Sequence, residues 1–281
     1  METVLFYKGK HIFTQACKYL ALLGLAFLFF LPIYWVFKGS LQPNADIKAW
    51  PPIWVPWPAT LDNFKTAFGL LPLARFAFNS LVIALGTIAS NVVFCSLAGY
   101  TLARKRFWGR DFIFLLIVGT MMIPFHIRLI PMYSMAIHLG LANTYVAQIL
   151  PISVMGYGVF LMRQFFLALP NAVEDAARID GCGEWGLVFR IAVPMATPAI
   201  FSLALFALVA TVEDFLWPMI ITTRTEMRPL PTGITMFAGR VIYDWGALLA
   251  ATAITILPLL IIFIVFQNSL AQGVTAGAVK E

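Results

Sequence analysis

Apolar residues along this chain fall into six long runs separated by polar segments. A helix needs about 20 apolar residues to cross a bilayer, and the six runs predict spans at 19–37, 76–102, 112–127, 145–166, 199–221 and 246–266. Polar interruptions within the runs are few. The pattern therefore predicts an all-α membrane protein whose transmembrane region, residues 19–270, is a six-helix bundle.

The composition agrees with this pattern. Hydrophobic residues make up 61% of the 281 residues and charged residues only 11%, whereas average soluble proteins are about 25% charged. The mean hydropathy is +0.87. The net charge of +6 could indicate nucleic acid, but the positive residues lie beside apolar runs, which is typical of membrane topology. We therefore expect the lipid bilayer as a partner and no nucleic acid.

Basic residues gather in two places, the N-terminal segment and the loop after the second span. They are Lys8, Lys10, Lys18, Arg104, Lys105, Arg106 and Arg110. Short basic segments stay in the cytoplasm, and six spans return both ends to the same side. The cytoplasmic segment 1–18, the cytoplasmic tail 271–281 and the loop between spans four and five are the resulting predictions for a multi-pass protein of the cytoplasmic (inner) membrane.

That loop, residues 169–198, is the longest polar segment in the second half of the chain and predicts two short helices joined by a hinge. Asn171 is the expected N-cap, with Glu174 completing a capping box. Gly181 is the expected C-terminal stop, because glycine enters the left-handed conformation cheaply. A second apolar helix around Trp185 to Ala192 is expected, ended by Pro194 and Pro198.

Within the first of these helices, helical spacing places Val173, Ala176, Ala177 and Asp180 on one face. Glu174 and Arg178 are spaced to pair with each other on another face. Small residues on a short helix allow a second surface to approach its backbone. By shape alone, the alternative is an ordinary cytoplasmic loop.

The residues of this helix, Glu-Asp-Ala-Ala-Arg-Ile-Asp-Gly at Glu174–Gly181, resemble the EAA loop of binding-protein-dependent ABC importer permeases. The Glu-Ala-Ala of that motif falls on Asp175, Ala176 and Ala177, with aspartate in place of the first glutamate. Residues 120–151, the FLMRQFFLALP before the loop and the terminal GAVK at 277–280 also look like sugar-type permeases of the maltose and glycerol-phosphate importer class.

The resemblance implies that the loop is a coupling helix that docks on a separate ATPase and passes its motion to the spans. The implied coupling residues are Glu174, Asp175, Ala176, Ala177, Arg178, Asp180 and Gly181. The implied function is ATP-driven import of a carbohydrate or related polyol. The implied partners are a second homologous permease, two ATPase subunits and an extracytoplasmic substrate-binding protein.

ATP and Mg are expected on the ATPase subunits, because this chain has no G-x-x-x-x-G-K-[ST] motif to cradle phosphates. The sequence also shows no catalytic grouping, and its three cysteines and three histidines are too scattered to predict a metal site. The chain is therefore interpreted as a transporter subunit and not an enzyme.

Glu213 and Asp214 stand inside the fifth apolar run. A charge in the membrane core costs at least about 2.5 kcal/mol, so it usually faces a partner or a watery path. One hypothesis is that they line the substrate pathway, and the alternative is that they pair near the outer end of the span. Asn79 and Asn91 are weaker pathway candidates, because polar residues in spans more often join helices.

Two rival functions stay open at this point. In the first, an ion-gradient-driven secondary transporter uses Glu213 and Asp214 as its proton or cation site. In the second, an intramembrane enzyme needs paired catalytic groups, yet adjacent helical residues point about 100° apart and form no natural acid–base pair.

Overall fold

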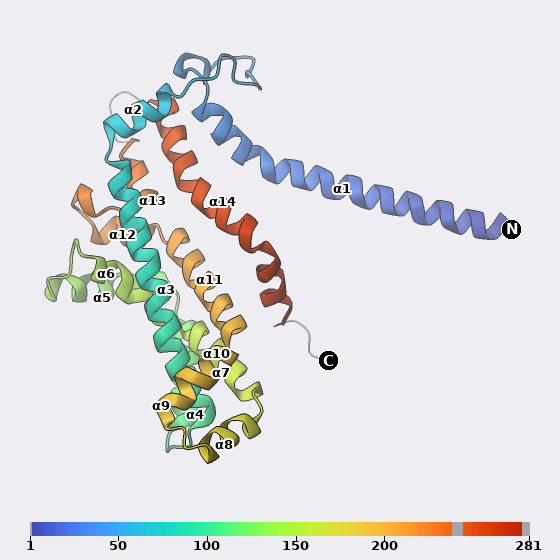
Figure 1. Cartoon of the computed structure of the whole chain (residues 1–281). Coiled ribbons are helices and arrows are strands. Elements are labelled where there is room, and N and C mark those ends of the chain that lie inside the picture. The colour runs from blue at the N-terminus through green and yellow to red at the C-terminus, as the bar shows by residue number, and fades with distance from the viewer. Residues whose placement is uncertain (1, 238–243, 277–281) are drawn as a thin grey trace. The chain divides into compact units, whose positions relative to one another are not determined.

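The computed structural model describes residues 2–237 and 244–276, with side chains for 14–237 and 244–267, so the predicted GAVK motif lies outside the described residues. The described residues form helices and loops, with no strand among them (Figure 1). The chain divides into two compact units. One combines Met1–Leu71 with Met236–Leu257, and the other combines Pro72–Thr235 with Pro258–Glu281.

Three described helices are long and apolar enough to cross a membrane alone. They lie in α1 (Glu2–Ser40), α3 (Leu73–Arg104) and α14 (Trp245–Ala276). Three bent pairs bring the count to six if each pair is one span. They are α4 (Arg110–Met121) with α5 (Phe125–His138), Tyr145–Ile152 with α7 (Gly156–Ala168), and Glu184–Met195 with α11 (Thr197–Glu213). The all-α architecture predicted from the hydropathy pattern is confirmed, and the three bent pairs make six spans a plausible count.

Two predicted spans end earlier than expected. The third was predicted as one run over 112–127, but α4 ends at Met121 and the chain bends by 100° before α5. The bend lies at Pro124, the N-cap of α5, which is not helical and has a ψ of 139°. A proline also disfavours helical backbone at the residue before it, here Ile123. The fifth was predicted over 199–221, but α11 ends at Glu213 and a separate helix α12 (Leu216–Ile221) follows.

The remaining elements are short. They are η1 (Asn44–Asp46), α2 (Asp62–Leu70), α6 (Tyr145–Ile149), η2 (Leu150–Ile152), α8 (Asn171–Ile179), α9 (Glu184–Gly186), η3 (Leu187–Ala192), α10 (Val193–Met195), η4 (Thr225–Met227), α13 (Leu230–Gly233) and η5 (Ile234–Phe237).

In the first unit, Asn63 of α2 fastens the end of α1 to the start of α14. Its amide donates to the carbonyl oxygens of Ser40 at 3.0 Å and Gln42 at 2.7 Å. Gly246 is required beside it, because a Cβ there would lie 2.2 Å from Oδ1 of Asn63. A buried amide with several backbone partners fixes this junction.

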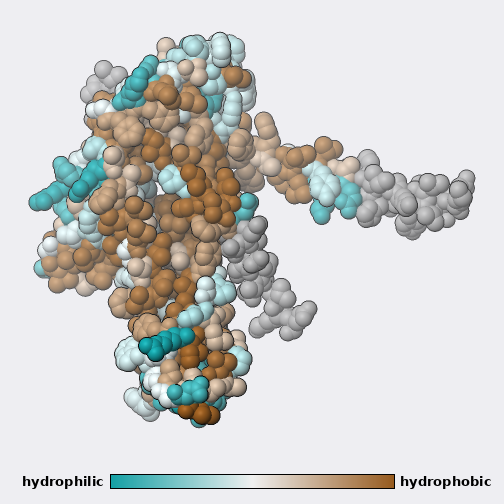
Figure 2. All heavy atoms as spheres, viewed as in Figure 1, coloured by the Kyte–Doolittle hydropathy of each residue, from teal (hydrophilic) through white to brown (hydrophobic). Residues whose placement is uncertain are grey.

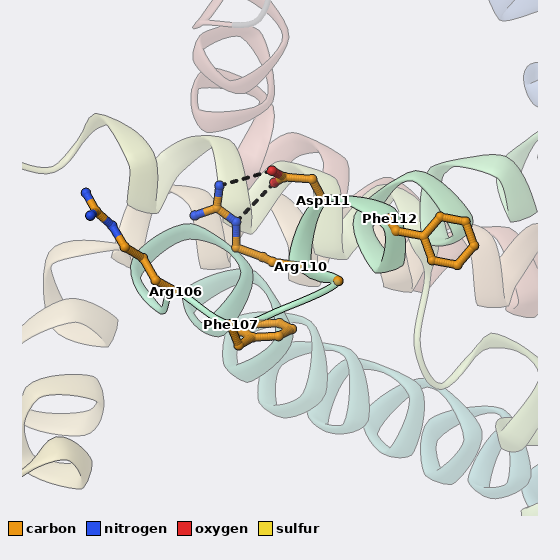
Figure 3. Close-up of a pocket in the computed structure, with 6 residues that line it drawn as sticks. Arg106, Phe107, Arg110, Asp111 and Phe112 are labelled. Carbon is orange, nitrogen blue, oxygen red and sulfur yellow. Dashed lines mark hydrogen bonds and ion pairs between the residues drawn. The ribbon is translucent and has the colours of Figure 1, made fainter.

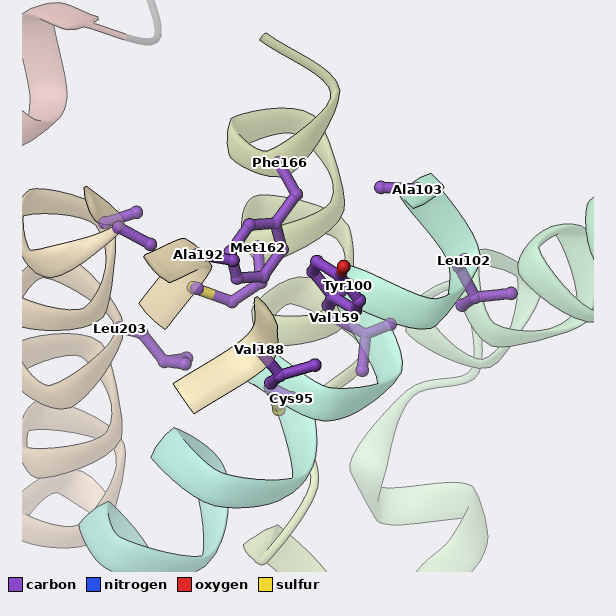
Figure 4. Packing of buried hydrophobic residues seen from close by; sticks show 12 residues of the cluster. Cys95, Tyr100, Leu102, Ala103, Val159, Met162, Phe166, Val188, Ala192 and Leu203 are labelled. Atoms are coloured by element: carbon purple, nitrogen blue, oxygen red, sulfur yellow. The ribbon is translucent and has the colours of Figure 1, made fainter. Parts of the chain in front are cut away.

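The core of the second unit forms where α3, α7 and α11 meet, together with η3 (Figure 4). Small residues recur every fourth position along α3 at Cys95, Gly99 and Ala103, and all three are buried. A Cβ on Gly99 would lie 2.6 Å from Cβ of Met162 in α7. The two backbones therefore approach closely, which is the usual way that membrane helices pack.

The outer surfaces of the spans remain apolar (Figure 2). Phe29 of α1, Leu115 of α4 and Ile264 of α14 are 74%, 65% and 63% exposed. Large exposed apolar surfaces mark contact with lipid or protein. Exposure of this kind along long apolar helices fits a multi-pass membrane protein.

Candidate functional site

The predicted coupling helix is present as α8, and its C-terminal stop is confirmed at Gly181. This glycine has a φ of +79°. Its N–H donates to the Arg178 carbonyl at 3.1 Å, and the N–H of Cys182 donates to the Ala177 carbonyl at 2.9 Å. This paired arrangement is a Schellman motif, which satisfies the last carbonyls and ends the helix sharply.

The predicted capping box at the other end is wrong. The N-cap position is held by Pro170, which gives no side-chain cap, and Asn171 is already helical. The Asn171 side chain instead accepts a hydrogen bond from Arg104, the last residue of α3. Glu174 also turns inward, and its Oε1 lies 3.2 Å from Nε of Arg104. An interhelical partner has replaced both local capping contacts.

The residues of α8 divide between two faces. Glu174 and Ala177 are buried beneath the helix, at 9% and 8% exposure. The exposed coupling candidates are Asp175, Ala176, Arg178, Asp180 and Gly181. Of the four residues predicted to share one face, Val173, Ala176 and Asp180 are exposed, whereas Ala177 is buried at the edge of that face. Val173 and Ile179 are apolar yet 37% and 87% exposed.

The predicted Glu174–Arg178 pair is also absent from the described contacts of α8. Arg178 lies 3.4 Å from Glu184, which also accepts a hydrogen bond from Lys105. The hydrogen bond from Lys105 lowers the pKa of the Glu184 carboxyl, which lies in the polar loop. Both pairs are largely exposed, so each contributes little to stability.

The second loop helix, predicted around Trp185 to Ala192, continues through Pro194 and ends at Met195, before Pro198. Helical structure runs from Glu184 to Met195 and then bends by 78° into α11. Its middle, Leu187–Ala192, is a wide π-helical stretch, an arrangement that absorbs irregular hydrogen bonding near a proline. On its exposed side, Trp185 and Phe189 stack with ring centroids 5.9 Å apart and are 71% and 52% exposed.

Glu213 and Asp214 lie where α11 ends. Glu213 is the last helical residue and is exposed, whereas Asp214 has extended backbone and is partly buried. Asp214 accepts a hydrogen bond from the N–H of Trp217 at 3.3 Å. The two carboxylates therefore stand at the helix break after α11, a position that fits either a pathway role or the predicted alternative near the end of the span.

Asn79 and Asn91 are both 0% exposed. Each side chain forms hydrogen bonds with backbone groups of a non-helical or interrupted segment elsewhere in the chain. Asn79 donates to the carbonyls of Glu226 at 2.8 Å and Arg228 at 2.9 Å. Asn91 donates to the Ile152 carbonyl at 2.7 Å and accepts from the N–H of Met155 at 3.0 Å. These contacts support the helix-joining alternative, and a pathway role for either amide stays a prediction.

Asn91 also holds a break in the fourth apolar run. The helix opens between η2 and α7, with a bend of 50°. Pro151 lies in η2 before this opening, and Gly156 begins α7 after it. Because the freed backbone groups would be costly in the membrane, the amide of Asn91 replaces their lost partners.

The basic loop between α3 and α4 borders a cavity of about 560 Å³ (Figure 3). It is lined by Arg106, Phe107, Gly109, Arg110, Asp111 and Phe112. Arg110 forms an ion pair with Asp111, with Nε of the arginine 3.0 Å from Oδ1 of the aspartate. Arg106 is exposed and forms no hydrogen bond or ion pair with the described part of the chain. The cavity contains none of the predicted site residues.

Sequence reasoning missed Arg104 and Tyr100 as partners of the predicted coupling helix α8. It assigned Arg104 only to the basic cluster, and no local spacing indicates that it meets Glu174. The structure brings these residues together because α3 ends beside the start of α8. Among the described residues, no group of three or more potential ligands could hold a metal ion.

Comparison with known proteins gives a consistent result. Residues 92–276 match the family described as binding-protein-dependent transport system inner membrane component. The chain is 36% identical to an arabinooligosaccharides transport system permease of Halalkalibacterium halodurans, covering 94% of this chain and 96% of the relative. It is 32% identical to a sulfoquinovosyl glycerol transport system permease of Agrobacterium fabrum, covering 98% and 95%.

A solved structure is also similar, a bacterial ABC transporter involved in the import of the acidic polysaccharide alginate. The TM-score is 0.81 at 20% identity, over 90% of this chain and 95% of the solved chain. This similarity concerns the fold.

Proposed function

The chain belongs to the carbohydrate-type family of binding-protein-dependent ABC importer permeases, and from this premise we propose that it moves a carbohydrate or related polyol across the cytoplasmic membrane, driven through α8 by a separate ATPase. It is a transporter subunit and not an enzyme. Membership implies a substrate-binding protein and an ATPase as partners. In the proposed complex, a second homologous permease and two ATPase subunits complete the particle.

The surface of α8 carries this proposal. The helix is short, stopped by a Schellman motif, and held from below by Glu174 and Ala177. Val173, Ala176 and Ile179 face outward. Exposed apolar residues in an otherwise polar loop mark a protein contact, and a helix that presents such a face fits a groove on a partner. We assign that groove to the ATPase.

The proposed mechanism is alternating access. ATP and Mg bind to the ATPase subunits, whose closure displaces α8 and swings the spans from inward-open to outward-open. The termini and the loop of residues 169–198 then face the cytoplasm. The short basic segments support this orientation.

The substrate class is inferred from relatives. Their names describe transport of arabinooligosaccharides, sulfoquinovosyl glycerol and trehalose or maltose. All are sugars or glycosides, so a carbohydrate is the proposed cargo. Glu213 and Asp214 are the proposed pathway residues, because carboxylates at a helix break can accept hydrogen bonds from sugar hydroxyls.

Reconstitution tests the proposal. The purified complex in proteoliposomes, with the binding protein outside, is given Mg and ATP inside and a panel of arabinotriose, maltose, lactose and diacetylchitobiose. We expect vanadate-sensitive uptake of at least one sugar, and none when the ATPase is omitted. Uptake by this chain alone, driven by an ion gradient, would contradict the proposal and support secondary transport.

A further inference from the structure

One arginine at the end of α3 directs its whole guanidinium at the start of α8. The Arg104 side chain is only 9% exposed. Its two terminal nitrogens donate to the Asn171 side chain and to the Leu169 carbonyl, and its Nε forms the ion pair with Oε1 of Glu174 without hydrogen-bond geometry. A planar guanidinium fixes orientation as well as position, because its donors are held in a rigid fork.

Glu174 is joined to α3 a second time, through Tyr100. The Tyr100 hydroxyl donates to Oε2 of Glu174 at 3.4 Å. Tyr100 and Arg104 are four residues apart and so share one face of α3. The Tyr100 ring is 1% exposed and packs edge-on against Phe166 of α7, with centroids 5.5 Å apart. The carboxylate of Glu174 thus connects α8 to the core between α3 and α7.

The other contacts of α8 are weaker anchors. Ala177 is the other residue of α8 that is buried, and it offers a single methyl group. The Arg178–Glu184 pair is 46% and 61% exposed at its two side chains. Exposed pairs are screened by salt and contribute little. The attachment of α8 to the spans therefore depends mainly on Arg104 and Glu174.

We propose that Arg104 is a positioning residue that attaches α8 rigidly to α3, so that a displacement of α8 moves the spans by the same amount. This inference rests on the proposed function, because it takes α8 as the element that the ATPase moves. Without the guanidinium, α8 changes its orientation relative to α3 while Ala177 remains in contact, and less sugar is transported for each ATP hydrolysed.

The first test measures the attachment directly. Spin labels at Thr101 and Ala172, both exposed, report the α3–α8 distance by pulsed EPR in the full complex, with Cys17 and Cys182 replaced by serine. We expect a narrow distribution for the parent and a broad one for Arg104→Gln. Arg104→Lys, which keeps the charge but loses the fork, should be intermediate. Arg106→Gln is the matched control, since it removes the same charge from an exposed position two residues after Arg104.

An unchanged distribution in Arg104→Gln would overturn the proposal. This measurement needs no transported sugar, so it decides the attachment even if the wild-type complex shows no ATP-dependent uptake, a result that would overturn only the proposed function.

The second test measures coupling as sugar transported per ATP hydrolysed, using the sugar of the panel that the wild type carries. We expect Arg104→Gln to lower uptake about tenfold or more while ATP hydrolysis stays within about twofold. Arg106→Gln should change neither. Equal losses of uptake and hydrolysis, with a lowered unfolding temperature, would show a merely structural role and contradict the proposal.

Discussion

Adding one methyl group at Gly99 should destabilise the protein, although the same change elsewhere in a helix usually stabilises it. Alanine is favoured over glycine in a helix by about 0.5–1 kcal/mol. At Gly99, the new Cβ would lie 2.6 Å from Cβ of Met162 and 2.8 Å from the backbone nitrogen of Arg163. Ordinary carbon contacts are about 3.5–4.0 Å, so α3 and α7 must separate by roughly 1 Å. Overpacking of this kind costs about 1–3 kcal/mol.

Two other glycines make this prediction a graded series. Gly86→Ala, also in α3, meets only the flexible tip of Ile149 at 2.6 Å, so it should be close to neutral. Gly119→Ala in α4 meets nothing within 4 Å and should be neutral or stabilising. Stability can be measured as the unfolding midpoint in mixed micelles titrated with a denaturing detergent. We expect the midpoint to fall in the order Gly119→Ala, Gly86→Ala, Gly99→Ala. If Gly99→Ala proved as stable as Gly119→Ala, the close approach of α3 and α7 would be refuted.

Three further changes test other parts of the account. Gly181→Val places a β-branched side chain at a φ of +79°, at a cost of about 1–2 kcal/mol, and should abolish uptake while the protein stays in the membrane. Gly183→Val, where φ is −73°, should retain uptake, and equal uptake by both variants would contradict the reasoning. Ala176→Trp should prevent co-purification of the ATPase without changing the unfolding temperature of the permease. Ala177→Trp should instead lower that temperature. The reverse pattern would show that the exposed and buried faces of α8 are misassigned. Asn91→Leu leaves the Ile152 carbonyl and the Met155 N–H without their partner, at about 1–3 kcal/mol each. It should therefore lower the unfolding midpoint more than Ser90→Leu, a change at the partly buried neighbouring residue. Equal effects would argue against the role of the Asn91 amide.

The features that depend on local sequence were predictable. Apolar runs identified α3 and α14 closely, and a glycine at the right spacing identified the end of α8. In each case the physical cause, either desolvation of the backbone in lipid or the conformational freedom of glycine, acts within a few residues.

The features that depend on tertiary partners were not predictable. Asn171 and Glu174 have good capping chemistry, but Arg104 offers a buried charged partner from a segment about 70 residues earlier, and loss of one partner of such a pair costs about 3–5 kcal/mol. A local cap is worth about 1 kcal/mol, so the tertiary contact wins. Similarly, local sequence does not show that Pro194 lies inside a helical segment, after a stretch with π geometry.

In the proposed mechanism, α8 receives the motion of an ATPase on the cytoplasmic side. The most direct measurement is photo-crosslinking in native membranes with benzoylphenylalanine at position 176, compared with the same probe at Ile130 of α5, which is 77% exposed. The account predicts an adduct with the ATPase subunit from position 176 and none from position 130. An adduct with the extracytoplasmic binding protein from position 176, or no ATPase adduct there in an assembled complex, would contradict it.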